Sequence, residues 1–382
     1  MSATPDQAAV PTTENCRFCW MCRHVCPVGL VTSRETLTPH AWALTIESVK
    51  RKQLTWNRET ADVMFACADC GLCRSHCVTD QPLPDAIAEA RAEVVNRGVA
   101  PEVVAEIDRK LRAHANPYVA EAPAPYSPGL KTRPPSPRPP SAGVALFVGD
   151  TGHHLGARSV DAAIKLLRAT GVEVVPICSG RSSGLLANSL GLKATAEALG
   201  RAVLEEVEAS GAKELLVLAP ADRWTFEYVY PQRLGLRWPA TVVVREATEV
   251  LAGALAEGRL KIEPGHHDAP YAYHDPCHSP RVARERPAPR ALVASVLGAS
   301  SARNLLWREH RAHPCGAIGG LEFTSPAIAR QLATARLRDA SNVGARVLVT
   351  EDPACLAHLG GHQPNGVTVS SLYELLADRL RG

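Results

Sequence analysis

The sequence has no apolar run long enough to cross a membrane, and its charges are nearly balanced. A membrane-spanning helix needs about 18 or more apolar residues in a row, whereas the apolar runs of these 382 residues are as short as strands. The first residues, MSATPDQAAVPTTENC, have neither a basic start nor an apolar stretch, so we expect no signal peptide. The net charge of +3 is spread along the chain, which argues against a nucleic-acid partner.

Motifs for several common chemistries are also missing. Without a G-x-G-x-x-G fingerprint, we expect no flavin or NAD bound to this chain. We find no Ser-His-Asp order and no paired carboxylates, so no catalytic residue is assigned. We expect a cytoplasmic protein, or one held at the inner face of the membrane by a partner, because an export signal is not evident.

Cysteine is abundant, and it follows a pattern. Eight of the 12 cysteines fall in the first 77 residues, in two C-x-x-C-x-x-C-x-x-x-C runs that are 51 residues apart. In a chain without an export signal, such cysteines indicate metal or redox chemistry rather than disulfides. The runs are Cys16, Cys19, Cys22, Cys26 and Cys67, Cys70, Cys73, Cys77.

The runs match the ferredoxin pattern. The first ends in Cys26-Pro27, as in bacterial ferredoxins, while the second ends in Cys77-Val78. Three thiolates on one tight loop can reach three corners of a cubane, and the fourth cysteine opens the next helix and points to the other cluster. Zinc sites are the alternative, but they usually use C-x-x-C pairs that lie far apart. We therefore expect two 4Fe–4S clusters, held by Cys16, Cys19, Cys22, Cys77 (cluster one) and by Cys67, Cys70, Cys73, Cys26 (cluster two).

The residues around the two runs are predicted to be helical. Apolar residues at helical spacing indicate helices at 39–51, 83–97 and 101–114. With the segments CPVG, Thr38-Pro39 and CADCGLC, this part resembles the α-helical ferredoxin module of succinate dehydrogenase iron–sulfur subunits. The resemblance implies an all-α module with two clusters.

After the predicted helices the sequence becomes rich in proline. Residues 121–141 contain eight prolines and indicate an extended linker. Short apolar strands then alternate with helices, which predicts parallel sheets covered by helices. The strands are expected at 144–148, 172–177, 214–218, 241–244, 271–274 and 346–350, and the helices at 157–169, 193–210, 246–256, from 289, and 326–341. The fold class is α+β, with domains at 1–120, 142–262 and 263–382.

The second part contains an internal repeat. GAKELLVLAPAD (211–222) aligns with GARVLVTEDPAC (344–355) without a gap, FVGD (147–150) with HDPC (274–277), and PICSGRSSG with HPCGAIGG. Three loop positions recur in each copy, and loops at the carboxyl ends of parallel strands are where such sheets bind ligands. The positions are Asp150, Cys178 and Asp222 in the first copy, and Cys277, Cys315 and Cys355 in the second.

HDPCHSPR, HPCGAIGG and TEDPAC carry a second resemblance. This part resembles the duplicated cysteine-rich CCG domain of heterodisulfide reductase and of the iron–sulfur subunits of glycolate oxidase, D-lactate-type dehydrogenases and anaerobic glycerol-3-phosphate dehydrogenase. The layout resembles that of the D subunit of heterodisulfide reductase. The sequence departs from the family where aspartates replace cysteines in the first copy, at positions 150 and 222, and where Pro314 and Asp352 do so in the second. The cysteines of a non-cubane cluster pair are therefore incomplete.

Three cysteines could still hold a third iron–sulfur cluster. We expect Cys277, Cys315 and Cys355 as its ligands, with a fourth from Cys178, His278, His313 or Asp352. The alternative is a scaffold with three buried, inert thiols.

The resemblance implies an iron–sulfur electron-transfer subunit. It would take electrons from a flavoprotein dehydrogenase that acts on a 2-hydroxy acid, glycerol-3-phosphate or an N-methylated amine, and pass them to a quinone or another carrier. The alternative is a catalytic subunit that reduces a disulfide or a quinone at a C-terminal cluster.

Overall fold

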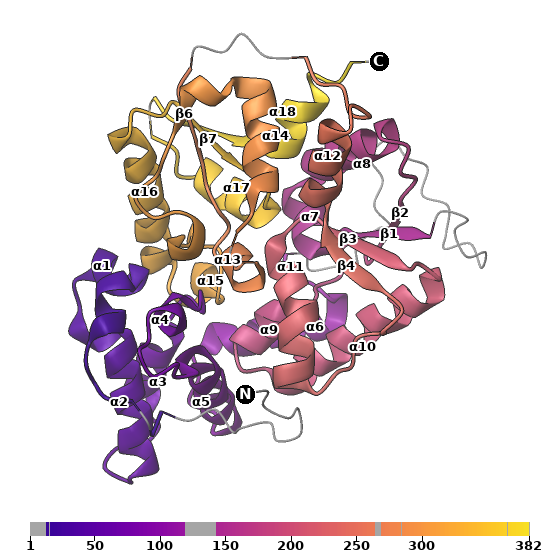
Figure 1. Cartoon of the computed structure of the whole chain (residues 1–382). Coiled ribbons are helices and arrows are strands. Elements are labelled where there is room, and N and C mark those ends of the chain that lie inside the picture. Colours follow the sequence, from indigo (N-terminus) through magenta and orange to yellow (C-terminus); the bar gives the residue numbers. More distant parts are fainter. Residues whose placement is uncertain are drawn as a thin grey trace.

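A helical N-terminal part packs against two α/β units. The computed structural model describes residues 13–14, 16–118, 143–263, 269–283, 285–364 and 366–381. The indigo and purple helices of the first part lie beside both the magenta and the orange-to-yellow units (Figure 1). The proline-rich segment expected as a linker at 121–141 lies outside the described residues.

The N-terminal part is all-helical where it is described. Helix α2 begins at Pro39, whose fixed φ suits the first turn of a helix, and α3 begins at a capping box between Asn57 and Thr60. The elements are η1 (Met21–Val25), α1 (Pro27–Thr32), η2 (Glu35–Leu37), α2 (Pro39–Lys50), α3 (Arg58–Phe65), α4 (Leu72–Ser75), α5 (Leu83–Asn96) and α6 (Glu102–His114).

The first α/β unit is built on a four-stranded parallel sheet. Its strands are β1 (Val144–Phe147), β2 (Val175–Ile177), β3 (Glu214–Val217) and β4 (Val243–Glu246), in the order β2-β1-β3-β4. Its helices are α7 (Gly149–Leu155), α8 (Ala157–Ala169), α9 (Leu185–Ser189), α10 (Lys193–Ser210), α11 (Pro220–Trp224), a π-helix η3 (Thr225–Leu234) and α12 (Ala247–Ala256).

The second unit repeats this order. Its strands are β5 (Tyr271–Tyr273), β6 (Ala302–Arg303), β7 (Val347–Thr350) and β8 (Thr368–Ser371), in the parallel order β6-β5-β7-β8. Its helices are α13 (Ser279–Val282), α14 (Pro287–Leu297), η4 (Ala299–Ser301), η5 (Glu309–Arg311), α15 (Leu321–Thr324), α16 (Pro326–Asn342), α17 (Pro353–Gly360) and α18 (Leu372–Ala377). The two sheets confirm the duplicated α/β architecture, and β3 and β7 lie where the ungapped alignment pairs them.

One strand is displaced from its expected position. The strand expected at 241–244 runs from Val243 to Glu246. Residues before it form a turn, in which the Val242 N–H donates to the Pro239 carbonyl over 3.0 Å. The helices expected at 157–169 and 193–210 are confirmed as α8 and α10.

The hydrophobic core crosses the boundaries between the units. One cluster of buried side chains joins Trp42 and Phe65 of the N-terminal part to Phe147 of the first unit and to Leu321 of the second. Another cluster joins the two α/β units, as shown by Leu146 and Leu372. The N-terminal part therefore packs as an integral layer of the fold.

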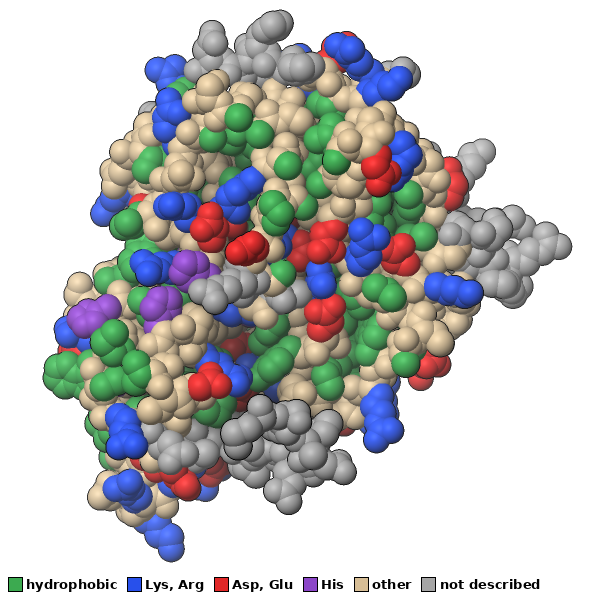
Figure 2. All heavy atoms as spheres, viewed as in Figure 1, with side chains coloured by type: hydrophobic (Ala, Val, Ile, Leu, Met, Phe, Trp, Pro, Cys, Tyr) green, Lys and Arg blue, Asp and Glu red, His purple; other side chains and the backbone are tan. Residues whose placement is uncertain are grey.

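The surface is mixed in charge. On the face shown in Figure 2, basic and acidic side chains are interspersed, as expected from the small net charge. In the described part of the chain, we find no helix with both the length and the hydropathy needed to cross a membrane.

Candidate metal centres

The four cysteines expected for cluster one lie together. Cys16 and Cys19 lie on the loop before η1, and Cys22 lies within η1. Burial, followed by the neighbouring charges of Cys16, Cys77 and Cys19, raises the pKa of Cys22 to about 11. Cys77 therefore joins the first run in space, although it belongs to the second run in sequence. Cys19 is exposed to solvent.

The four cysteines expected for cluster two also lie together, farther from solvent. Cys26, Cys67 and Cys70 are buried. Burial raises the pKa of Cys26, and the largest effects of neighbouring charges on this pKa come from Cys70 and Cys67. The pKa of Cys73 is likewise raised, first by burial and then by Cys67, Cys70 and Cys26. The structure thus brings together the two crossed sets that the spacing predicts.

Backbone N–H groups point at several of these sulfurs. The Gly29 N–H donates to Cys26 Sγ over 3.4 Å, the Asp69 N–H to Cys67 Sγ over 3.4 Å, and the Gln81 N–H to Cys77 Sγ over 3.3 Å. Such bonds favour thiolates and tune cluster potentials. Cys26 is also the N-cap of α1, as expected for a fourth ligand that opens a helix. The counterpart Cys77 is followed by a turn, and the next helix, α5, begins only at Leu83.

The donor sets fit iron–sulfur clusters. Eight thiols in two groups of four, with N–H donors aimed at sulfur, supply the ligands of two cubanes. Burial raises the pKa of most of these thiols, Cys26, Cys67 and Cys73 among them, so cluster binding at these thiols releases protons. When bound, such clusters accept and donate single electrons.

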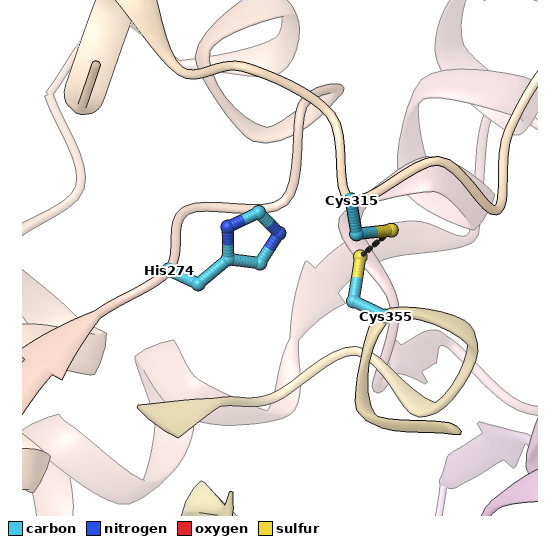
Figure 3. A group of neighbouring side chains, drawn as sticks. All are labelled: His274, Cys315 and Cys355. Carbon is cyan, nitrogen blue, oxygen red and sulfur yellow. Dashed lines mark hydrogen bonds between the residues drawn. The ribbon is translucent and has the colours of Figure 1, made fainter. Parts of the chain in front are cut away.

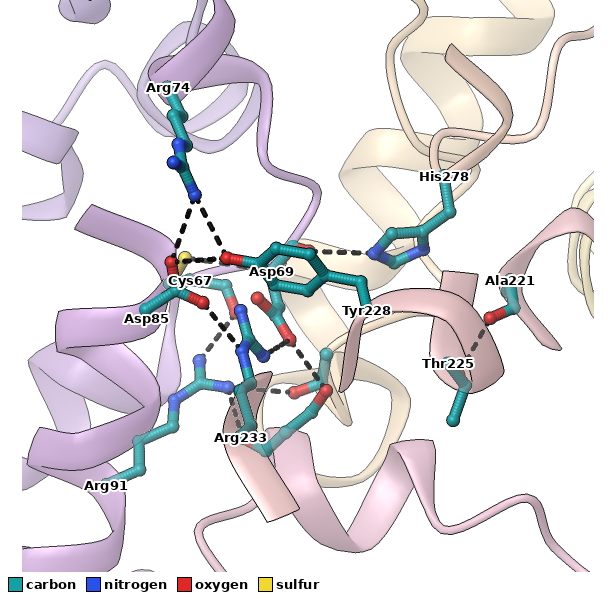
Figure 4. Close-up of polar contacts among 12 residues, drawn as sticks. Cys67, Asp69, Arg74, Asp85, Arg91, Ala221, Thr225, Tyr228, Arg233 and His278 are labelled. Atoms are coloured by element: carbon teal, nitrogen blue, oxygen red, sulfur yellow. Dashed lines mark hydrogen bonds and ion pairs between the residues drawn. The ribbon is translucent and has the colours of Figure 1, made fainter. Parts of the chain in front are cut away.

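The second cysteine run is clamped to the α/β units by buried arginines. The Arg91 side chain, 1% exposed, donates to the carbonyls of Met64, Cys67, Ser189 and Gly319. Figure 4 shows it converging on this loop from α5. The cost of burying its charge is offset by these charge-assisted hydrogen bonds.

A second set of contacts surrounds Asp69 in the same loop. Arg233, from the π-helix, pairs with Asp69 over 3.5 Å and with Asp85 over 2.8 Å (Figure 4). The Asp69 carbonyl lies 3.1 Å from His278 Nε2, and the His278 ring stacks on Trp224 at 4.4 Å between centroids. π-Helical segments are rare and frequently occur at functional sites.

The same loop lies against the C-terminal cysteines. Arg281 Nε donates to the Cys70 carbonyl over 2.9 Å. Burial raises the pKa of Cys277, and the largest charge effect on it comes from Cys70. The expected cluster-two loop and Cys277 are therefore direct neighbours.

Cys277, Cys315 and Cys355 line one cavity of about 90 Å³ between the two α/β units. Cys315 Sγ and Cys355 Sγ lie 2.9 Å apart. Cys178 is not among the lining residues that the structure describes. It follows β2, and its backbone N–H donates to Glu206 over 2.6 Å.

The expected fourth ligands lie in different surroundings. Asp352 caps α17, because its Oδ1 accepts from the N–H groups of Ala354 and Cys355 over 2.9 and 3.0 Å. His278 faces Asp69 as described, and His313 stacks on Trp307 at 4.0 Å between centroids. The third cluster and its fourth ligand stay predictions.

Carboxyl groups from the first α/β unit also line the cavity. Asp150 and Asp222 line it at the positions equivalent to Cys277 and Cys355. Burial raises the pKa of Asp222 to about 8, with further contributions from Asp150 and Asp352, and burial raises the pKa of Asp150 to about 6. None of the described lining residues is a lysine or arginine. These carboxyls are therefore partly or fully protonated at neutral pH.

Comparison with protein families agrees with this geometry. The 4Fe-4S dicluster domain family matches residues 15–81, and the cysteine-rich domain family matches residues 271–360. The chain joins a 4Fe–4S dicluster domain to a cysteine-rich domain. The first match covers all eight N-terminal cysteines, and the second covers Cys277, Cys315 and Cys355. The expectation of an iron–sulfur protein is confirmed, while the number of clusters stays a prediction.

Relatives span most of the chain. The D subunit of the dihydromethanophenazine:CoB–CoM heterodisulfide reductase of Methanosarcina acetivorans is 25% identical over 79% of this chain and 73% of its own length. A probable membrane-anchored ferredoxin of Chromohalobacter salexigens is 26% identical over 84% of this chain and 48% of its own length. The B subunit of the fumarate reductase (CoM/CoB) of Methanothermobacter marburgensis is 23% identical over 91% and 67%. The resemblance to the D subunit of heterodisulfide reductase is confirmed.

A solved structure shares the fold. A hypothetical protein from Helicobacter pylori matches 90% of this chain and 67% of its own, with a TM-score of 0.57 and 11% identity. At this identity the likeness concerns the fold alone.

Sequence reasoning missed the residues that connect the centres. Arg91 sits within ordinary helical sequence and no motif marks it, and Arg281 is marked only as the last residue of HDPCHSPR. His274 is marked only as the first residue of HDPCHSPR. Its position directly after a strand and three residues before Cys277 is the signal that could have found it.

Proposed function

We propose that this chain is an iron–sulfur relay that receives electrons from a flavoprotein dehydrogenase and passes them to a quinone or another carrier. The dehydrogenase would act on a 2-hydroxy acid, glycerol-3-phosphate or an N-methylated amine. Cys16, Cys19, Cys22 and Cys77 would hold cluster one, and Cys26, Cys67, Cys70 and Cys73 would hold cluster two. The relatives named as reductase subunits support the presence of a partner subunit.

The difference in burial between the two cysteine sets carries the proposal. The first set reaches the surface at Cys19, whereas Cys67 and Cys70 are each 8% exposed and lie under the α/β units. A relay needs one centre at the surface, where a partner protein can dock, and another next to the following centre. The two sets are also close to each other, since the charge of Cys22, in the first set, raises the pKa of Cys73, in the second. This arrangement suits a relay.

Exposed apolar side chains flank the first set. Met21 is 51% exposed and Val78 is 71% exposed, and each directly neighbours a cysteine of the set. Apolar residues at a surface are a common feature of protein interfaces. We therefore place the docking site of the electron donor here.

The test compares a protein donor with a small one. The double variant Met21→Gln, Val78→Asn removes apolar contacts without changing charge, and Leu44→Gln, at a residue 53% exposed on α2, is the matched control. Stopped-flow reduction by a copurifying flavoprotein should slow about tenfold in the double variant, and reduction by methyl viologen radical should not change. Equal rates with the flavoprotein would place the docking site elsewhere.

Metal analysis tests the relay itself. Anaerobically purified protein should contain at least about eight irons and eight sulfides per chain. Protein with a full complement of zinc in the N-terminal sites would refute the relay.

A catalytic role is the second candidate, and the cavity favours it. Asp222 and Asp150, whose pKa values are raised by burial, line the same cavity as three cysteines. Reduction of a disulfide or quinone needs two electrons and two protons, which clusters and carboxyls can supply. Steady turnover of a disulfide by the chain with reduced viologen would favour this role over a simple relay.

A further inference from the structure

A cavity of about 480 Å³ lies where the N-terminal part meets the second α/β unit. Helices α1 and α16 pack against each other there (Figure 1), and both line the cavity, α1 through Leu30 and Val31 and α16 through Arg330 and Arg338. Small-molecule pockets in proteins commonly measure about 300–1,000 Å³, whereas the cavity that the C-terminal cysteines line measures about 90 Å³. The larger cavity, which we call the α1–α16 cavity, therefore has room for a small organic molecule.

The wall that α16 forms is basic. Among the described lining residues, Arg330, Arg336 and Arg338 are basic, and only Asp339 is acidic. Arg336 Nη1 pairs with Asp339 Oδ2 over 3.0 Å, so this carboxylate is already neutralised. Arg330 and Arg338 are exposed, and neither forms an ion pair with another residue that the structure describes. An anion is therefore the complementary ligand for this wall.

Arg336 carries a buried positive charge that its neighbours satisfy only in part. It is 2% exposed, and its Nε donates to His274 Nδ1 over 3.4 Å. His274 in turn lies beside Cys315 and Cys355 (Figure 3). Among the described residues, Arg336 Nη2 has no hydrogen-bond partner, and a buried donor without a partner is costly. An anion in the cavity that Arg336 lines would balance this charge.

The wall that α1 forms is apolar. Pro27, Leu30 and Val31 line it, and Trp307 adds an aromatic ring. Leu30 is 48% exposed, and a ligand with an apolar body would remove this side chain from water, which is favourable. An inorganic anion such as phosphate would use the arginines alone. The two walls together therefore fit an organic anion.

From these observations we propose that the α1–α16 cavity binds a small organic carboxylate, with its carboxylate at the arginines and its apolar body against α1. The proposal goes beyond the electron relay, because none of the described residues that line this cavity is a cysteine. The site nevertheless adjoins both cysteine-bearing parts. Pro27 directly follows Cys26, and Pro314, another lining residue, directly precedes Cys315.

The experiment measures binding to the full-length protein, purified anaerobically, by isothermal titration calorimetry. The probe is 4-phenylbutyrate, and the comparison is its neutral amide, 4-phenylbutanamide. We expect the acid to bind at one site per chain with a Kd below about 1 mM. The amide should bind at least about tenfold more weakly, because it lacks the charge that the arginines attract.

Two variants, each with a matched control, locate the bound acid. Leu30→Glu should weaken binding at least about tenfold, because it places a negative charge in the cavity, whereas Leu44→Glu, at a leucine 53% exposed on α2, should bind as the parent does. Arg338→Gln should weaken binding about threefold, because one attracting charge is lost, and Arg201→Gln, at an exposed arginine on α10, should not. An iron content equal to that of the parent shows that each variant has kept its fold.

Three outcomes would overturn the proposal. The first is the absence of binding of 4-phenylbutyrate at concentrations up to about 10 mM. The second is equal binding of the acid and the amide, which would mean that the cavity does not select an anion. The third is unchanged binding of the acid by both Leu30→Glu and Arg338→Gln, which would place the ligand elsewhere.

Discussion

Replacing Arg91 should weaken the attachment of the second cysteine run to the rest of the fold. In Arg91→Met, the side chain keeps much of its volume, but four buried carbonyl groups lose this donor. The Met64 carbonyl still accepts from the Cys67 N–H, so at about 1 kcal/mol for each of the other three groups the loss of stability is about 3 kcal/mol. If this loss appears mainly in the unfolding step, the rate of unfolding rises up to about 150-fold.

Loss of the cluster reports this unfolding. The parent and Arg91→Met would be diluted into guanidinium under anaerobic conditions, and the decay of the iron–sulfur absorbance would be followed at several denaturant concentrations. Extrapolated rates in water give the change in kinetic stability. We expect the unfolding rate of Arg91→Lys to lie between those of the parent and Arg91→Met, since an ammonium group can donate to some but not all of the carbonyls.

The control is Arg97→Met, at the C-terminal end of the same helix. Arg97 forms an exposed pair with Glu93 over 2.7 Å, and such pairs contribute up to about 1 kcal/mol. If Arg91→Met decays within about threefold of the parent, or no faster than Arg97→Met, the clamp does not stabilise the fold as we argue.

Three further predictions concern single sites. Cys22→Ser and Cys73→Ser should each remove one ferredoxin-type signal from the low-temperature EPR spectrum of the reduced protein, and two intact signals in both would refute the ligand assignment. Arg281→Gln should lower the midpoint potential of cluster two by roughly 50–100 mV in EPR-monitored titrations, because a cation next to the Cys70 carbonyl is lost; an unchanged potential would contradict this. Asp222→Asn should be increasingly more stable than the parent as pH rises, because the asparagine does not ionise. Because the folded pKa of Asp222 is raised to about 8, the parent loses stability above the unfolded pKa of about 3.9, by at most about 1.4 kcal/mol per pH unit up to pH 8. The measurement is the unfolding temperature of each protein at several pH values. A difference between the two proteins that stays constant from pH 5 to 8 would contradict the raised pKa of Asp222.

Much of the fold could be predicted because its helices and strands carry strong periodic patterns. Helix α10 matches its expected bounds of 193–210, and the ungapped alignment of 211–222 with 344–355 places β3 and β7 in equivalent positions. Strand β6 was missed because it has only two residues, both exposed. The π-helix η3 was missed because Pro231 lies inside it, and a proline usually ends a helix.

The candidate centres could be predicted only as far as local spacing reaches. The crossing of Cys26 and Cys77 between the two sets follows from the ferredoxin pattern. The approach of Cys277 to Cys70 depends on packing between segments about 200 residues apart in sequence, and no periodicity records it. The same holds for Arg336, which reaches His274 from another helix.

The burial of the second cysteine run restricts how the protein can be assembled. Arg91 and Arg281 close over its backbone from two different segments of the chain, and Gly319 lies so close to Ala68 that a Cβ at Gly319 would stand 2.7 Å from the Ala68 backbone. We therefore expect a cluster bound by this loop to be inserted before the second α/β unit packs against the loop. Because the N-terminal residues leave the ribosome first, this order would let the cluster be inserted during synthesis.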